Sequence, residues 1–540
     1  MKSLLYKFLF VSALFGAVAC EDFETVNTDP NNPDVVPTNM IMAGAEKQII
    51  DNVYDFWFSG RQCMVYTQYW AQRNYTEEDR YQIRESVNNN YFNYLYQGAA
   101  NLETIIKLNT EAESAIKMSV YGNNANQIAA AKILKVWLYQ LMTDTWGSIP
   151  YTEASKLKEG VYYPKYDDQT EIYKSLIAEL TSAVNSINED EPAFIGGDRI
   201  FEGDASKWKK FGNSLKCRLA IHISKVDSKW KTYIAEALAS GVFESNKDNA
   251  VYAYSATAPE QCGFYIGCFV DRRNDFTITR TFVDILKGQK DTLNVKSHPW
   301  EGVSDPRLPL YTTARNGKYI GMPYGIPSNK VASAMRNAAP IWNNTNYTYD
   351  ETKVPMILHN DFTVPLMTYA ELQFIISEYK GFSKEEYQNG IRASLEYWSQ
   401  LNGTPINSES EPINTAQANA YIEAVSTTVN AETVAMQKYI DLYMNGTEAW
   451  VEYRRTGYPT QLLKPGEISV VYGGEEIPFS TLSDTKGDII SRVKYPTNES
   501  TLNAQSFTDA VAKLQDGSNN YYSKMFWDVR TTSNPHPANK

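Results

Sequence analysis

Apolar residues recur at helical spacing over most of the chain. Ile41, Ala45, Ile49 and Val53 fall on one helix face, and similar stripes return as far as about residue 455. We expect helices over residues 40–57, 90–108, 126–145, 168–187, 206–222, 228–240, 281–286, 366–379, 385–399, 415–425, 431–444 and 447–455. Successive helices joined by loops predict a mainly α fold of tetratricopeptide-like hairpins, although no clean repeat of about 34 residues is detectable.

The clearest helix runs from Asn126 to Thr145. Its apolar residues cover much of the circumference, which indicates a helix buried among others. We expect it to end at Trp146-Gly147, because glycine readily leaves the helical conformation and Pro150 prevents its continuation. The next helix begins at Asp168, where a capping aspartate is followed three residues later by Glu171.

Helical periodicity breaks down between residue 241 and about residue 360. This part of the sequence predicts a large irregular elaboration with few short strands. Long irregular segments in a helical protein usually carry function, so we expect the ligand-binding elaboration here. The segment from Trp70 to Tyr81 interleaves tyrosines with charges without a clear period and also suits a loop.

The N-terminus has the pattern of a secretory signal peptide. Lys2 and Lys7 precede an apolar run from Phe8 to Phe15, which is too short to span a bilayer. The following small residues end at Cys20 and resemble the lipobox of bacterial lipoproteins, although Ala17 stands where leucine is more usual. We expect residues 1–19 to be removed, Cys20 to be acylated, and the Asx- and Pro-rich residues 20–39 to form a lipid-anchored tether. The alternative is an ordinary signal peptide with an incidental Cys20.

Bulk composition narrows the partners of the mature chain. The 540 residues carry a net charge of -12, and loss of Lys2 and Lys7 makes it more negative, which argues against nucleic acid. No later segment is apolar enough to span a membrane, and no interior linker divides residues 40–540, so we expect a single domain. The remaining cysteines read as small core residues, with a bridge between Cys262 and Cys268 as the alternative. Neither a metal site nor a cofactor motif is evident, and His222 reads as a core histidine.

Several stretches together resemble one family, the SusD-like (RagB/SusD) nutrient-binding lipoproteins. The resemblance spans nearly the whole mature chain and is most specific in the branch with the Tyr-Arg-Arg-Thr-Gly-Tyr-Pro run at residues 453–459 and the Tyr-Pro-Thr-Asn-Glu run at residues 495–499. The supporting stretches are Trp146 to Pro150, Asp167 to Tyr173, Trp208 to Ser214, Asp305-Pro306-Arg307-Leu308, and Thr368-Tyr369-Ala370-Glu371. The acidic residues after Cys20 are similar to the signal that sends such lipoproteins to the cell exterior.

The resemblance implies both an architecture and a role. It implies about four tetratricopeptide-like hairpins in an outer-membrane lipoprotein that faces the exterior. Such a protein captures an oligosaccharide, or in some members a peptide, and acts as a lid over a SusC-type TonB-dependent transporter. It is not an enzyme. Its shared motifs read as structural, with Arg454 and Arg455 pairing with carboxylates.

We predict the ligand site from exposed aromatic rings and hydrogen-bonding groups in irregular segments, because flat rings stack on sugars and charged groups bind bidentately. The predicted ligand-binding residues are Trp70, Tyr75, Asp79, Arg80, Tyr81, Arg273, Asn274, Asp275, Phe276, Trp300, Trp342 and Tyr347. The alternatives are packing of each aromatic within its loop and structural ion pairs at Arg80 and Asp275. A glycan-degrading surface hydrolase or an adhesin remains as an alternative of another class, although the sequence shows no G-x-S-x-G, H-E-x-x-H or P-loop motif.

Overall fold

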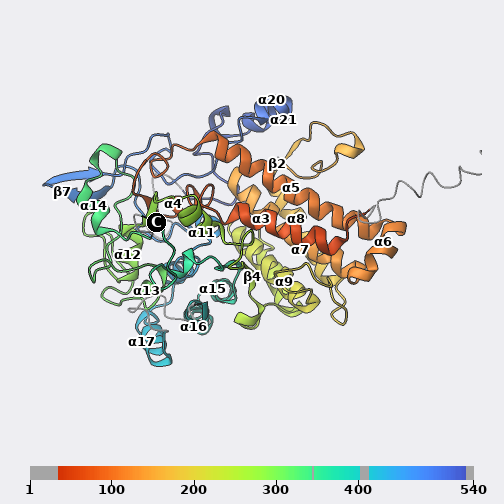
Figure 1. Ribbon diagram of the computed structural model, residues 1–540, viewed down its shortest axis with the longest axis horizontal. Helices are drawn as coiled ribbons and strands as arrows, with labels where there is room; N and C mark the ends of the chain where they lie inside the picture. Colours follow the sequence, from red (N-terminus) through yellow and green to blue (C-terminus); the bar gives the residue numbers. More distant parts are fainter. Residues whose placement is uncertain (1–34, 343–345, 402–412, 531–540) are drawn as a thin grey trace, which may run out of the picture.

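The computed structural model describes residues 35–342, 346–401 and 413–530. The predicted signal peptide, the predicted acylation site Cys20 and all but the last residues of the predicted tether lie outside the described residues. Within them, no helix is long and apolar enough to cross a membrane. Figure 1 shows an elongated body with long helices toward one end and short elements joined by loops toward the other.

Helices that follow one another in the chain pack on one another. α3 (Thr38–Val53) packs on α5 (Glu85–Thr110), α5 on α7 (Asn124–Trp146), α7 on α8 (Gln169–Asn185), and α8 on α9 (Ala205–His222). α10 (Trp230–Ser240) packs on α9, and α15 (Tyr369–Tyr379) packs on α16 (Lys384–Leu401). The prediction of a mainly α fold built from helical hairpins is confirmed.

Helix ends follow the local chemistry of the sequence. α7 is buried on nearly every side and ends at Gly147, which has a φ of 88° and donates its amide to the Thr143 carbonyl oxygen. The Asp168 side chain accepts the Thr170 amide at the start of α8. The helix predicted from Leu366 begins later, because Leu366 belongs to a strand and Thr368 caps α15.

The strands are short and form two-stranded antiparallel pairs. β1 (Trp70–Gln72) pairs with β5 (Phe276–Ile278), and β2 (Ile149–Pro150) with β3 (Tyr166–Asp167). β4 (Ala250–Ala253) pairs with β6 (Thr363–Met367), and β7 (Ile468–Tyr472) forms a hairpin with β8 (Glu475–Pro478). β4 and β6 are 109 residues apart in sequence at their nearest ends, so they join the helical part to the irregular part.

The irregular elaboration is built from short elements rather than long helices. Residues 241–360 include α11 (Gly263–Tyr265), α12 (Arg280–Leu286), α13 (Leu308–Tyr311) and α14 (Ser333–Ala338), as predicted for a loop-rich region. The remaining helices are α4 (Cys63–Tyr66), α6 (Ala112–Met118), α17 (Thr415–Val425), α18 (Ala431–Asp441), α19 (Gly446–Thr456), α20 (Glu499–Leu502) and α21 (Ala504–Ala512).

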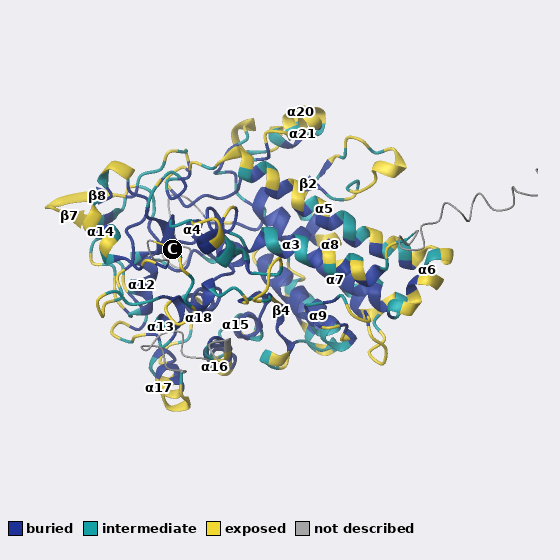
Figure 2. Cartoon of the chain, viewed as in Figure 1, coloured by how far each residue is buried: buried dark blue, intermediate teal, exposed yellow. Residues whose placement is uncertain are grey.

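Buried residues run through both parts of the body (Figure 2), and large aromatic and cationic side chains are among them. The fully buried tryptophans are Trp70, Trp146, Trp208, Trp398, Trp450 and Trp527, and the fully buried arginines are Arg218, Arg307, Arg454, Arg455 and Arg492. Cys63, Cys217, Cys262 and Cys268 are buried thiols, so Cys262 and Cys268 are not bridged. The high aromatic content of the sequence is therefore spent mainly on packing.

Candidate functional site

Two of the predicted segments lie side by side. β1 and β5 place Trp70 opposite Ile278 and Gln72 opposite Phe276. The pairing continues beyond the strands, because the Arg73 amide donates to the Asp275 carbonyl oxygen at 2.6 Å and the Asn74 side chain donates to the Asn274 carbonyl oxygen at 3.3 Å. The segments 70–81 and 273–276, about 200 residues apart, therefore form one structure, which local sequence patterns could not reveal.

Most of the predicted aromatic residues are nevertheless buried, which corrects the expectation that they are exposed. Trp70 is fully covered by the rings of Phe56, Phe264 and Trp342 and donates its indole N–H to the Tyr443 hydroxyl at 3.1 Å. The loops pack against each other and form a core of their own, so an irregular backbone did not mean a solvent-exposed side chain. The other predicted residues that are buried are Asp79, Tyr81, Asp275, Phe276, Trp300 and Trp342.

The remaining predicted residues keep some contact with solvent. Tyr75 is 60% exposed and has a positive φ of 57° in the loop after β1. Arg80 is half-buried and donates its Nε to the Ser480 carbonyl oxygen at 2.8 Å, so its role in the described structure is to hold a loop. Arg273, Asn274 and Tyr347 are half-buried. Trp300, which is buried, packs on His298 and lies outside the paired segments.

The most exposed tryptophan of the described residues was not among the predicted ligand residues. Trp57 is 41% exposed and lies just after α3, which ends at Val53 rather than at Trp57 as predicted. Two guanidinium groups lie over its ring, those of Arg61 at 4.8 Å and Arg273 at 5.8 Å from the centroid. Cation–π contacts of this kind help to fix the orientation of a ring that remains 41% exposed to solvent.

The arginines are themselves fixed by buried carboxylates. Arg61 donates to Glu78 at 2.9 Å and lies 3.5 Å from Asp275. Arg273 donates to the same Asp275 oxygen at 2.6 Å, and Arg84 pairs with Glu78 at 2.9 Å. This network links the predicted residues Arg273 and Asp275 to the ring of Trp57. The structural ion pair considered for Asp275 is present, and it positions a candidate binding surface.

Trp57 borders a cleft of about 390 Å³, which we call the Trp57 cleft. This volume lies within the range of small-ligand sites. Phe58 and Tyr91 are stacked with their centroids 3.5 Å apart, and Tyr94 is a second partly exposed ring. The lining residues are Asn52, Asp55, Trp57, Phe58, Arg84, Ser86, Val87, Asn90, Tyr91 and Tyr94.

The polar groups of the cleft can serve a neutral, hydroxyl-rich ligand. Ser86 and Asn90 on the first turns of α5, and Arg84 just before its start, are exposed donors or acceptors. Asp55 accepts the backbone amides of Phe58 at 2.8 Å and Ser59 at 3.1 Å. Burial raises the pKa of Asp55 to about 7, so this carboxyl carries only part of its charge near neutral pH.

Trp57, Phe58 and Trp70 form an aromatic cluster in the sequence, but Trp57 was placed at the end of the helix expected over residues 40–57 and was not chosen for the ligand site. The signal was present, since the cluster contains Trp57, Phe58 and Trp70, with Arg61 four residues after Trp57. Which of these rings can contact a ligand depends on which is exposed, and exposure depends on packing partners from distant segments. Tyr94 was missed because it lies in the helix expected over residues 90–108, whereas ligand residues were sought in irregular segments.

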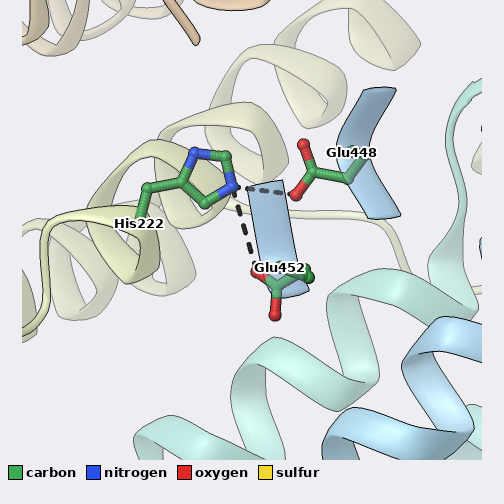
Figure 3. Close-up of side chains that lie close together, drawn as sticks. All are labelled: His222, Glu448 and Glu452. Atoms are coloured by element: carbon green, nitrogen blue, oxygen red, sulfur yellow. Dashed lines mark hydrogen bonds and ion pairs between the residues drawn. The ribbon is translucent and has the colours of Figure 1, made fainter. Parts of the chain in front are cut away.

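A second cluster, His222, Glu448 and Glu452, has atoms close enough to hold a metal ion (Figure 3). His222 Nε2 lies 2.8 Å from Glu448 and 4.0 Å from Glu452. Lys438 Nζ lies 3.1 Å from Glu452, and Arg218 Nε lies 3.6 Å from Glu448. These cations already neutralise the carboxylates, so an additional divalent ion would meet strong repulsion.

The charges within this cluster balance one another. Burial alone would raise the pKa of Glu448, but the positive charges of His222 and Arg218 outweigh burial and lower the pKa to about 2. Arg455 pairs with Glu378 and Glu452, as predicted for a carboxylate partner, whereas Arg454 donates to the backbone carbonyl oxygens of Asp144 and Ser491. His222 is the buried core histidine that its place on an apolar helix face predicted.

Comparison with known proteins agrees with this architecture. A family model described as SusD-like, starch-binding and associating with the outer membrane, matches residues 30–496. No curated protein matches the chain significantly.

Solved structures share the fold over almost the whole chain at low sequence identity. A chitin-binding protein is 23% identical, with a TM-score of 0.70, over 91% of this chain and 100% of its own. A SusD homologue from Parabacteroides distasonis is 20% identical, with a TM-score of 0.70, over 93% of this chain and 99% of its own. A chitin-binding SusD homologue from Flavobacterium johnsoniae is 21% identical, with a TM-score of 0.66, over 91% of this chain and 99% of its own. Because the family match covers most of the sequence and the fold agrees from end to end, the chain belongs to the SusD-like family.

Proposed function

We propose that this protein is a surface lipoprotein that binds an oligosaccharide in the Trp57 cleft and delivers it, as a lid, to a SusC-type TonB-dependent outer-membrane transporter. The exposed ring of Trp57, held by two arginines beside a cleft lined with amides and hydroxyls, is the observation that carries the binding role. The family description, starch-binding and associating with the outer membrane, supports the ligand class and the location. Two of the similar structures are described as chitin-binding.

The test of binding is calorimetry with a panel of starch-derived, chitin-derived and other oligosaccharides, and with short peptides as a second panel. Trp57→Ala should weaken the affinity for the bound oligosaccharide about thirtyfold, because a buried aromatic contact at a binding site contributes roughly 2 kcal/mol. Trp57→Phe should retain part of the affinity, since a smaller stacking surface remains. Tyr472→Ala is the matched control, because Tyr472 on β7 has a similar exposed fraction but lies outside the cleft.

Three results would argue against this proposal. Equal affinity of Trp57→Ala and the native protein would remove the cleft from the binding site. Binding of peptides alone would favour the peptide-binding alternative, and release of shortened glycans would favour the hydrolase. For the partner, mild-detergent extraction of outer membranes should copurify a large β-barrel protein with the native chain, and its absence would contradict the role as a lid.

A further inference from the structure

Five apolar side chains are gathered at one end of the body and are each more than half exposed. They come from the start of α3, from α6 with the turn after it, and from the loop before α9. We call them the apolar end patch: Val36, Met40, Ile116, Val120 and Ile195. Single exposed apolar residues are common on protein surfaces, but a group from three segments is a candidate interaction surface.

Backbone contacts hold the three segments together. The Ile195 amide donates to the carbonyl oxygen of Tyr121, which follows Val120, at 2.8 Å. The Asn39 side chain donates to the Ile195 carbonyl oxygen at 2.9 Å and so ties the loop to the residue before Met40. Gly197 adopts a φ of 85°, and a Cβ atom at this position would lie 2.1 Å from the Asn39 carbonyl oxygen. The patch is therefore preformed by a tightly packed loop.

The position of the patch identifies its occupant. Val36 belongs to the patch and is the second residue of the described chain, so the patch lies where the predicted tether joins the body. Fifteen residues separate Cys20 from Val36. A fully extended chain of this length spans at most about 55 Å, so the patch cannot move farther than this from the acylated residue. Figure 1 shows α6 at one end of the long axis and the β7–β8 hairpin at the other.

We propose that the apolar end patch rests on the lipid bilayer into which the acyl chains of Cys20 insert. This inference depends on the acylation that forms part of the proposed function. A tether of fixed length makes the contact intramolecular, so a surface too weak to bind a membrane by itself becomes occupied. Apolar side chains of this kind enter the boundary between head groups and acyl chains.

The surrounding charges define the type of membrane contact. Residues 189–191 are Glu-Asp-Glu, are exposed, and precede the Ile195 loop by a few residues. Glu113 on α6 is also exposed, and these carboxylates outnumber the exposed Lys117 beside Ile116, so we expect the contact to come from apolar burial rather than from attraction to anionic lipid. Added salt should therefore leave the contact unchanged, because salt screens charge interactions and not apolar burial.

The experiment uses the acylated full chain in vesicles of phosphatidylcholine with brominated acyl chains. Val120→Cys carries an environment-sensitive fluorophore, and Val471→Cys at the far hairpin carries the same fluorophore as a control. The four cysteines of the described body are buried, so labelling is directed to the introduced thiol. We expect severalfold stronger quenching at position 120 than at position 471, unchanged at high salt. Replacing both Ile116 and Ile195 by serine should reduce the quenching at position 120 toward the control level.

The outcomes separate this inference from the proposed anchor. Vesicle flotation reports the anchor, and the label reports the patch. Flotation with equal quenching at both positions would overturn the patch contact and leave the anchor intact. Failure to float would overturn both. A change in the environment of the fluorophore at position 120 that occurs only when the transporter is also present, without quenching by brominated lipid, would assign the patch to a protein partner and overturn the membrane contact.

Discussion

Arg218→Met should strongly destabilise the fold, because Arg218 neutralises a buried carboxylate. Arg218 is fully buried on α9 and donates to both oxygens of Glu371 on α15, at 2.7 and 2.6 Å. It also donates to the Leu366 carbonyl oxygen at 2.8 Å and lies 3.6 Å from Glu448 on α19. The variant leaves the carboxylate of Glu371 buried without its cation, which costs about 3–5 kcal/mol.

The melting temperature measures this loss. At an unfolding entropy of about 2.1 cal/mol/K per residue, a chain of 540 residues shifts by about 1 °C for each kcal/mol, so Arg218→Met should lower the melting temperature by about 3–5 °C. Differential scanning calorimetry and guanidinium unfolding give independent measurements. Lys330→Met is the matched control, because Lys330 forms an exposed pair with Glu475 that contributes at most about 1 kcal/mol.

A double-mutant cycle tests the assigned cause. Arg218→Met combined with Glu371→Met should be less destabilised than the sum of the two single variants by at least about 2 kcal/mol, because neither charge is then left buried alone. Glu448 keeps His222 at 2.8 Å, so the double variant should still fold. Additive losses, or a single-variant loss as small as that of Lys330→Met, would refute the reasoning.

Two further predictions concern stability. Burial raises the pKa of Asp79 to about 8, so the folded state holds a proton that the unfolded state releases near pH 4. The protonated Asp79 side chain therefore contributes fully to stability below pH 4, and this contribution is lost as the pH rises through about 8. Asp79→Asn should flatten this part of the pH profile of unfolding, and an unchanged profile would contradict the assignment. Gly203 has a φ of 84°, and a Cβ there would lie 1.9 Å from the Phe194 carbonyl oxygen, whereas Gly160 has a φ of 87° with no atom within 4 Å. Gly203→Ala should therefore lower the melting temperature clearly more than Gly160→Ala, which introduces only backbone strain of about 1 kcal/mol. Equal decreases in the two variants would show that the clash with the Phe194 carbonyl oxygen does not cause the loss.

Local sequence patterns predicted the long helices, but not shorter ones such as α6 and α21, and not the long-range partners of any helix. The limits of α7 follow from its own apolar residues and from Gly147, so they could be predicted without a structure. Leu366 was assigned to a helix because its apolar neighbours fit either period. Its strand exists because Val364 pairs with Tyr252, more than a hundred residues earlier in the chain.

The candidate site was predicted only in part for the same reason. Arg273 and Asp275 were among the predicted residues and do lie beside the Trp57 cleft, because their mixture of charges in an irregular segment was a local signal. Trp70 was predicted on equal grounds but is buried, since Phe56, Phe264 and Trp342 converge on it from three segments. Whether a ring faces solvent or protein depends on these distant neighbours, and composition does not specify them.

Helix α3 connects the apolar end patch to the Trp57 cleft and therefore fixes the distance between them. α3 begins beside Val36 and Met40 and ends four residues before Trp57, and a 16-residue helix is about 24 Å long. If the N-terminal end of α3 contacts the lipid bilayer, the length of the helix sets the distance between the membrane and the bound oligosaccharide. If the receptor tilts about this end of α3, a captured oligomer would approach the membrane, but it could not rise above the height that the helix sets.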